Sequence, residues 1–259
     1  IIMKNDITVS IIIPYFKKRI FFQKTIRSII NQKFKKYEII LIYDDQNLKE
    51  LDFVKKVLKK VKRKKILINK KNLGAGMSRN KGILVSKGKF IAFCDADDVW
   101  KKNKLSLQLL FMQKNNLNFS HTSYSIIDQN SKIVGKFMIK KKINYQNLLT
   151  SCDIGLSTVI VSKKILKNNN FSKLKTKEDF QLWLKIIKKI YFIYGLKSEL
   201  SSWRVMKNSL SSSLIQKIED SFRLYYRYEK FNILISCFYV IRLTFFALFK
   251  KIKMYSISR

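Results

Sequence analysis

Cysteine and histidine are scarce in this chain of 259 residues. Its three cysteines, Cys94, Cys152 and Cys237, lie far apart without a CxxC pair, and His121 is the single histidine. Such a set argues against a disulfide framework and against a zinc site. The sequence therefore predicts a reducing, cytoplasmic setting.

Proline and glycine are rare as well, with one proline and seven glycines. No Pro-rich or Gly/Ser-rich linker, internal repeat or low-complexity tail divides the chain. Hydrophobic residues make up 47% of the sequence, which is enough to bury a core and argues against a disordered protein. We expect one globular domain with an appendage.

Acidic residues are few: 17 Asp and Glu stand against 54 Lys and Arg, and the formal net charge is +37. Such a charge suggests a nucleic-acid or anionic-membrane partner. An AT-rich genome produces the same bias toward Lys, Ile, Asn and Phe, so the charge alone identifies no partner.

A signal peptide is not predicted at the start of the sequence. The first apolar run, residues 7–13, leads directly into Pro14 and a charged segment, without a basic start or a small-residue cleavage site. We expect that the active part of the chain is not exported.

Short apolar runs alternate with amphipathic stretches in the first half of the chain. Buried strands are predicted at residues 7–13, 37–43, 65–69 and 89–94, and helices at 21–32, 48–61 and 76–86. Further on, helices are predicted at 104–116 and 178–190, and strands at 119–128 and 156–162. This order is typical of an α/β fold with a mostly parallel, Rossmann-like sheet between helices.

The composition changes at residue 214. Residues 232–249 form an apolar run that contains Arg242, which weakens the case for a membrane-spanning helix. C-terminal amphipathic or apolar helices that lie on a membrane surface fit the pattern better. We therefore divide the chain into a domain of residues 1–213 and a basic, apolar helical tail of residues 214–259. Packing against the first domain or forming an oligomer contact is the alternative role of the tail.

Seven of the 17 acidic residues form three clusters: Asp44-Asp45, Asp95-Asp97-Asp98 and Glu178-Asp179. The first two clusters follow predicted strands, at the edge where open α/β sheets bind ligands. Neighbouring carboxylates repel each other, so a site that gathers them normally contains a cation or a proton. Mg²⁺ or Mn²⁺ together with the phosphates of a nucleotide suits these oxygen ligands. A turn or a helix cap remains the alternative for the first and third clusters taken alone.

The glycine-containing segment 72–82, NLGAGMSRNKG, is not a dinucleotide fingerprint. Arg79 stands where the third glycine is needed, the segment follows the third strand, and GxxxxGK[ST] is absent. The segment instead presents Arg79 and Asn80 on a helix, where they suit phosphate and sugar oxygens. A solvated helix face is the alternative.

Together these segments resemble family 2 glycosyltransferases, which are inverting enzymes of the GT-A fold. The resemblance covers about residues 7–210. The segments that carry it are VSIIIPYF, SIINQKFKKYEIILIYDD, NLGAGMSRNKGILVSKGKFIAFCDADDVW and KTKEDFQLWLKI.

The resemblance implies a role for each matching residue. The nucleotide base would be held by Pro14, Tyr15, Phe16 and Asp45, with Asp44 close by. Arg79 would approach the diphosphate, and Asp95 and Asp97 of the DxD element would contact the ribose and the divalent ion, with Asp98 adjoining. In the pair Glu178-Asp179, Asp179 would be the catalytic base. The segment WRVMKNSLSSS would be the acceptor-side loop, with Trp203 and Arg204 near the diphosphate or the acceptor.

The function implied by the resemblance is sugar transfer that depends on Mn²⁺ or Mg²⁺. A nucleotide sugar, by the resemblance a UDP-sugar, would donate to a saccharide or lipid-linked saccharide in cell-surface polysaccharide synthesis. The basic tail favours peripheral attachment to the anionic inner face of the cell membrane. Nothing in the sequence indicates the oligomeric state.

Two other functions stay open at this point. A sugar-nucleotide nucleotidyltransferase also uses acids and a divalent ion, but a Gly-rich phosphate loop after the first strand is typical of it and is absent here. A basic nucleic-acid-binding protein would explain the charge and the 13% aromatic residues, but not the acid clusters. We therefore expect no nucleic-acid partner.

Overall fold

The computed structural model describes residues 7–206 and 213–255 of the chain. Its first half contains β1 (Val9–Tyr15), α1 (Arg19–Ile30), β2 (Tyr37–Tyr43), α2 (Leu48–Leu58), β3 (Lys64–Ile68), α3 (Ala75–Val85), β4 (Phe90–Phe93), β5 (Val99–Trp100) and α4 (Lys104–Lys114). Then follow β6 (Phe119–Ile127), β7 (Ile133–Phe137), β8 (Lys142–Asn144), α5 (Tyr145–Thr150), the 3₁₀ turn η1 (Leu156–Thr158), β9 (Ile160–Ser162), α6 (Lys163–Leu166), α7 (Glu178–Ile190) and β10 (Phe192–Arg204). The chain continues in α8 (Leu214–Arg223), the π-helical turn η3 (Leu224–Tyr228) and α9 (Ile233–Tyr255).

A single sheet runs through the molecule in the order β3-β2-β1-β4-β9-β6-β10-β5, with β7 beside β6 and β8 beside β10. The strands β3, β2, β1 and β4 are parallel, as predicted for the first half of the chain. In the second half β9 is antiparallel to both β4 and β6, whereas β6 and β10 are parallel. The predicted α/β fold is confirmed, and its antiparallel strands are concentrated in the second half.

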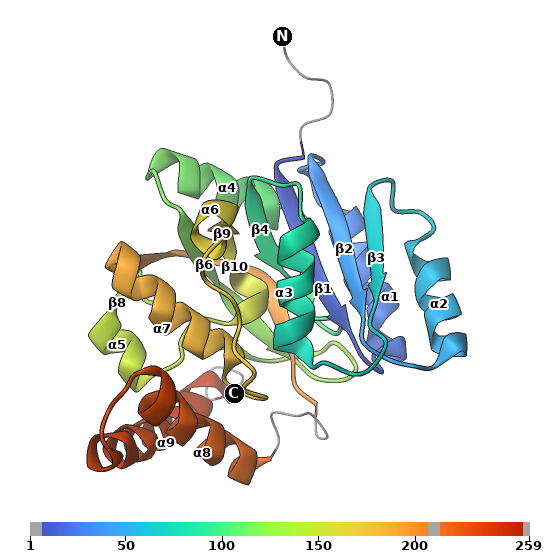
Figure 1. Ribbon diagram of the computed structural model, residues 1–259. Coiled ribbons are helices and arrows are strands. Elements are labelled where there is room, and N and C mark those ends of the chain that lie inside the picture. Colours follow the sequence, from blue (N-terminus) through green and yellow to red (C-terminus); the bar gives the residue numbers. More distant parts are fainter. Residues whose placement is uncertain (1–6, 207–212, 256–259) are drawn as a thin grey trace.

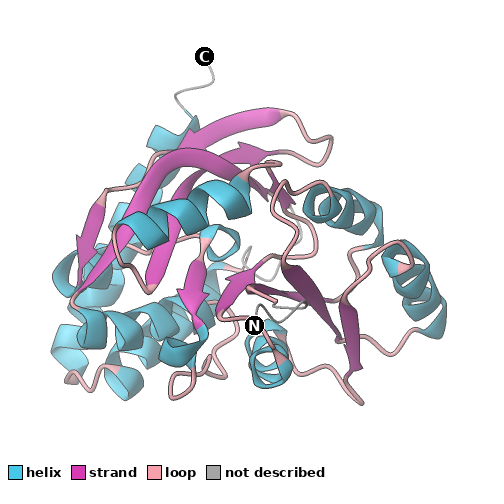
Figure 2. Ribbon diagram, turned by 90° about the horizontal axis from the view of Figure 1, so that it is seen from above, coloured by secondary structure: helices cyan, strands magenta, loops and turns pink. Residues whose placement is uncertain are grey.

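Helices cover both faces of the sheet (Figure 2). Because side chains alternate along a strand, Ile11 and Ile13 of β1 join the core under α1, α2 and α4, whereas Ile12 joins the core under α3 and α7. Residues buried on both faces explain why the central strands are near-continuous apolar runs.

The predicted elements of the first half are found within one to three residues of their expected ends, and α7 has the predicted bounds. The long strand β10 was not predicted. Its register against β6 shifts between Leu196 and Glu199 and again between Glu199 and Ser201, so an even alternation of apolar residues is missing from its sequence.

The C-terminal helices pack against the rest of the molecule. Leu224 and Tyr225 are buried in the core that contains α7, and the Tyr225 hydroxyl donates a hydrogen bond of 2.6 Å to the carbonyl oxygen of Leu149. Figure 1 shows α8 and α9 at the end of the molecule where the parallel strands finish. Among the residues that the structure describes, no helix combines the length and the apolar character needed to cross a membrane.

Candidate active site

Two of the three acid clusters lie at the carboxyl ends of parallel strands. Asp44 and Asp45 follow β2, and Asp95 follows β4 by two residues. Helix α3 begins after β3 and carries Arg79 to the same edge. Parallel strands end together at one edge, so these segments meet although they are far apart in the sequence.

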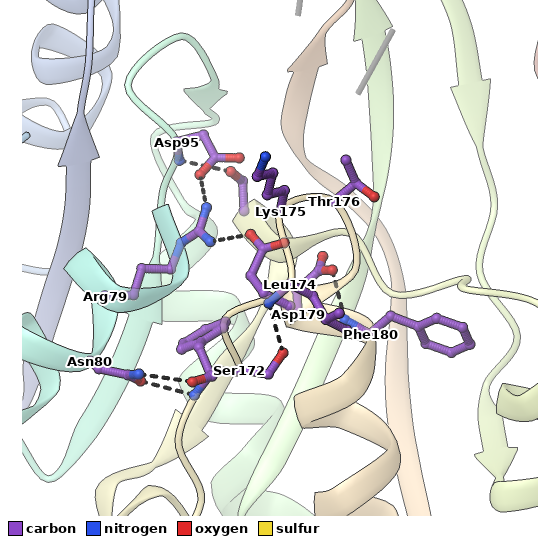
Figure 3. A network of polar contacts seen from close by, with 12 residues as sticks. Arg79, Asn80, Asp95, Ser172, Leu174, Lys175, Thr176, Asp179 and Phe180 are labelled. Atoms are coloured by element: carbon purple, nitrogen blue, oxygen red, sulfur yellow. Dashed lines mark hydrogen bonds and ion pairs between the residues drawn. The ribbon is translucent and has the colours of Figure 1, made fainter. Parts of the chain in front are cut away.

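Arg79 joins two of the acid clusters. Its Nη2 atom lies 2.8 Å from Oδ1 of Asp95, and its Nη1 atom lies 2.8 Å from Oε1 of Glu178 (Figure 3). The side chain is buried; burial lowers the pKa of an arginine, but the two carboxylates outweigh that effect and the pKa of Arg79 is raised. The guanidinium thus stays charged and fixes the distance between Asp95 and the start of α7.

Asp44 organises the loop before α3. Its Oδ1 atom accepts hydrogen bonds from the Asn69 side chain at 2.7 Å and from the Leu73 backbone at 2.8 Å, and Oδ2 accepts one from Gly74 at 2.8 Å. Gly74 has φ of +81°, a conformation that favours glycine. The side chain of Asp44 therefore fixes the loop from which α3 begins. This contact gives Asp44 a structural role in addition to the ligand contact that the sequence predicted.

The residues expected to hold the base differ in exposure. Tyr15 is fully buried between the rings of Phe22 and Tyr43, and its hydroxyl donates to Glu50. Pro14 is half-buried, and Phe16 is 40% exposed. Of the two aromatic rings, Phe16 is the one presented to solvent.

Asp45 is buried after β2 and stabilises a turn. Its Oδ1 atom accepts hydrogen bonds from the backbone amides of Gln46 at 2.8 Å and Asn47 at 3.3 Å. Both of these hydrogen bonds use the same carboxylate oxygen.

The DxD element is partly occupied by the protein's own cations. Nζ of Lys18 lies 2.6 Å from Oδ2 of Asp97, and Arg79 holds one oxygen of Asp95. Burial raises the pKa of Asp97, and the negative charge of Asp95 raises it further, against the opposing effect of Lys18. Two crowded carboxylates that already attract cations suit a divalent ion, which would take its other ligands from phosphates. Within residues 7–206 and 213–255, no group of three His, Cys, Asp or Glu side chains is arranged to hold a metal ion by itself.

Asp98, the third acid of this cluster, faces inward. Its Oδ1 atom accepts a hydrogen bond of 3.0 Å from the backbone amide of Arg204, and burial raises the pKa of this carboxyl well above its usual range. Asp98 therefore stabilises the DxD loop by binding the end of β10.

Glu178 and Asp179 form the first turn of α7. Burial, followed by the charge of Asp179, raises the pKa of Glu178 to about 7 although Arg79 opposes it. Burial also raises the pKa of Asp179, whose Oδ1 atom accepts a hydrogen bond of 2.7 Å from the Phe180 amide. Asp179 as a whole is half-buried, and its raised pKa makes the carboxylate more basic than that of an ordinary aspartate.

Arg204 and Trp203 end β10 beside the DxD element. Arg204 is buried, and its Nε atom donates a hydrogen bond of 2.9 Å to the carbonyl oxygen of Asp97. Arg204 therefore stabilises the loop that carries the DxD element. Trp203 is 40% exposed. The following residues 207–212 of the predicted acceptor-side loop lie outside the described residues.

Sequence reasoning missed several residues that shape the site. Lys18 pairs with Asp97, Ser157 accepts a hydrogen bond of 3.0 Å from the Asp95 amide, and Gly76 leaves room for Glu178, whose Cγ would lie 2.9 Å from an added Cβ. The NxG spacing of residues 72–74 could have indicated a tight turn. The other contacts join distant segments and carry no local signal.

Comparison with known proteins agrees with this architecture. The model of the family described as glycosyl transferase family 2 matches residues 10–173, which is more than half of the chain. The chain is 34% identical over 220 residues to a UDP-Glc:alpha-D-GlcNAc-diphosphoundecaprenol beta-1,3-glucosyltransferase, WfgD of Escherichia coli; the match covers 83% of this chain and 84% of the relative. It is 29% identical to the putative teichuronic acid biosynthesis glycosyltransferase TuaG of Bacillus subtilis, over 86% of this chain and 89% of that protein.

The fold is also found in solved structures. The mannosyltransferase PcManGT from Pyrobaculum calidifontis, solved with GDP-Man and Mn²⁺, superposes with a TM-score of 0.68 at 12% identity, covering 92% of this chain and 70% of that one. At this identity the likeness shows a shared fold.

The fold and the acid-lined strand edge define a GT-A glycosyltransferase. The chain belongs to glycosyltransferase family 2. The predicted family, fold and enzyme class are thereby confirmed.

Proposed function

We propose that this enzyme transfers a sugar, with inversion, from a UDP-sugar to a lipid-linked saccharide, and that the transfer requires Mn²⁺ or Mg²⁺. The observation that carries the proposal is the pair of ion contacts made by Arg79, since it brings Asp95 next to the helix turn that bears Asp179. UDP-glucose as the donor of a similar enzyme supports the choice of a uridine nucleotide.

Asp95 and Asp97 would hold the divalent ion together with the donor's diphosphate. When bound, that ion neutralises the negative charge that grows on the departing diphosphate. Arg79 keeps Asp95 in place, and the positive end of α3 faces the same edge, where backbone amides favour phosphate oxygens.

Asp179 would remove the proton of the acceptor hydroxyl as that oxygen attacks the anomeric carbon. Attack from the face opposite the leaving diphosphate inverts the anomeric configuration. A raised pKa makes Asp179 a better proton acceptor, and general-base catalysis of this kind contributes roughly 10²–10⁴-fold.

The tail, residues 214–259, would attach the catalytic domain, residues 1–213, to an anionic membrane surface that holds the acceptor. Val240 and Leu243 of α9 face the core, yet the opposite side of α9 is equally apolar and exposed. A helix that is apolar all round needs a second apolar environment. The exposed large apolar residues of this region are Leu214, Ile215, Ile218, Tyr226, Tyr228, Ile233, Leu234, Ile235, Phe238, Ile241, Phe245, Phe246, Leu248 and Phe249.

Charge complementarity favours an anionic leaflet over a protein partner. The guanidinium of Arg242 lies over the exposed rings of Phe238 at 6.0 Å and Phe246 at 5.7 Å, so a basic head accompanies the apolar surface. The sequence of α9 adds three lysines after Phe249. Each basic residue near an anionic leaflet contributes about 1 kcal/mol.

Two measurements test the proposal. Nucleotide sugars are screened for Mn²⁺-dependent thermal stabilisation of the full chain, and UDP-sugars are expected to stabilise it most. Sedimentation with anionic vesicles then compares wild type with Phe245→Glu, which should bind about tenfold or more weakly because a buried phenylalanine contributes ~1.5–3 kcal/mol. Leu84→Glu, at an exposed position of α3, is the control. Stabilisation by nucleotide sugars without any dependence on a divalent ion contradicts the metal requirement.

A further inference from the structure

Asp220 of α8 is a buried acid far from the three clusters in the sequence. Its side chain is fully enclosed, and its Oδ2 atom accepts three hydrogen bonds from the segment before α7. The donors are the Lys175 amide at 3.1 Å, the Thr176 amide at 2.9 Å and the Thr176 hydroxyl at 3.0 Å. Within the described residues the Oδ1 atom of Asp220 is buried without a hydrogen-bond partner, so the three donors to Oδ2 are what offsets the cost of burying this carboxyl group. These contacts therefore determine where the segment lies.

The segment that Asp220 binds leads directly to Asp179. Lys177, the residue before α7, makes no side-chain cap hydrogen bond. Lys175 and Thr176 lie on the turn beside Asp179 (Figure 3). The orientation of the first turn of α7 therefore depends on a carboxylate supplied by the C-terminal helices.

The rest of the C-terminal region is anchored independently of Asp220. Glu229, which follows η3, is buried; it lies 2.6 Å from Nζ of Lys188 near the end of α7 and accepts a hydrogen bond from Tyr145. Tyr225 is held by Leu149. The loss of Asp220 would thus release the segment before Asp179 while these other anchors keep α8 and α9 in contact with the domain.

We propose that Asp220 is a positioning residue for the transfer reaction: it fixes the turn that aims Asp179 at the acceptor hydroxyl. The inference rests on the proposed role of Asp179 as the base. It makes the tail part of the catalytic machinery as well as a docking surface. A base displaced by about 1 Å can lose as much as 10²-fold in rate.

The test compares Asp220→Ala, Asp220→Asn and Glu229→Gln in the full chain. We expect kcat to fall about 10- to 100-fold in Asp220→Ala and less in Asp220→Asn, whose amide oxygen still accepts. UDP affinity measured by calorimetry and the KM for the donor should stay within about threefold, since Asp45, Asp95 and Asp97 lie on other elements and Arg79 keeps its contact with Asp95. Glu229→Gln weakens the tail's other anchor, and its kcat should remain within about twofold of wild type. Thermal unfolding of every variant gives the stability that each has lost.

Four results would overturn the proposal. The first is a wild-type kcat in Asp220→Ala. The second is a loss of kcat in Glu229→Gln as large as in Asp220→Ala, at an equal loss of stability, because the effect would then be a general one of tail packing.

If Asp220→Ala does not fold, Thr176→Val, which removes only the hydroxyl contact, must show the same kcat-specific loss on a smaller scale. Wild-type turnover in Asp179→Asn would overturn the base assignment and this inference together, whereas an inactive Asp179→Asn beside a fully active Asp220→Ala would overturn the positioning role alone.

Discussion

Lys18, in the loop that follows β1, forms an ion pair with Asp97, in the loop that follows β4, with Nζ 2.6 Å from Oδ2. The side chain of Lys18 is 27% exposed, so it can turn toward solvent when another cation arrives. A lysine that occupies the carboxylate in this way competes with a divalent ion.

Lys18→Met should therefore bind Mn²⁺ more tightly than wild type. A partly exposed ion pair contributes ~0.2–1 kcal/mol, which corresponds to roughly 1.4- to 5-fold in Mn²⁺ affinity. The measurement is calorimetric titration of Mn²⁺ in the presence of UDP, with Lys17→Met, an exposed neighbour, as the control. Weaker Mn²⁺ binding in Lys18→Met would mean that Lys18 assists the ligand instead.

Arg79→Lys should weaken UDP binding and lower the free energy of unfolding. A lysine cannot contact Asp95 and Glu178 with two separate arms, so either Glu178, which is buried, or Asp95, whose side chain is 35% exposed, loses its partner. The loss of stability is largest when Glu178 is the one left unpaired. Leaving a buried acid unpaired costs about 3–5 kcal/mol, less what the lysine recovers. Chemical denaturation and UDP calorimetry measure both effects, and Leu84→Lys, at an exposed position of the same helix, is the control. An unchanged free energy of unfolding together with an unchanged UDP affinity would show that the two ion contacts of Arg79 contribute neither to stability nor to the donor site.

Lys104 gives the protein a pH-dependent stability. It is fully buried beside Gln108 and the Trp100 ring, and burial lowers its pKa to about 7. Between pH 7 and the ordinary lysine pKa of about 10.5, the unfolded chain binds this proton and the folded chain does not, so the contribution of Lys104 to stability rises with pH.

Lys104→Met should remove that rise. The difference in the free energy of unfolding between wild type and Lys104→Met should increase in favour of wild type by a few kcal/mol from pH 7 to pH 10. Chemical denaturation at several pH values measures it. A difference that is constant over this range would mean that the ammonium keeps its charge in the folded protein.

The parts of this protein that the sequence predicted are those encoded locally. Ile39, Ile40, Leu41 and Ile42 lie in one continuous, mostly β-branched apolar run of the kind typical of a buried strand, and β2 is found there. The acids at 95–98 and 178–179 were recognisable because each cluster is compact in an otherwise basic chain.

Contacts between distant segments could not be predicted in the same way. Lys18 is one of many lysines, and only the fold brings it to Asp97. Asp220 looks like an ordinary acid on an amphipathic helix until the three donors of residues 175–176 are placed around it. Such pairings depend on tertiary structure, which periodicity and motif spacing do not contain.

The most direct test of the account is sugar transfer by Asp179→Asn, measured beside its affinity for UDP. We expect UDP affinity in the presence of Mn²⁺ to stay within about twofold of wild type, and transfer to the lipid-linked acceptor to fall by about 10²–10⁴-fold. Transfer at the wild-type rate would contradict the account, because the acceptor hydroxyl would then lose its proton without the carboxylate of Asp179.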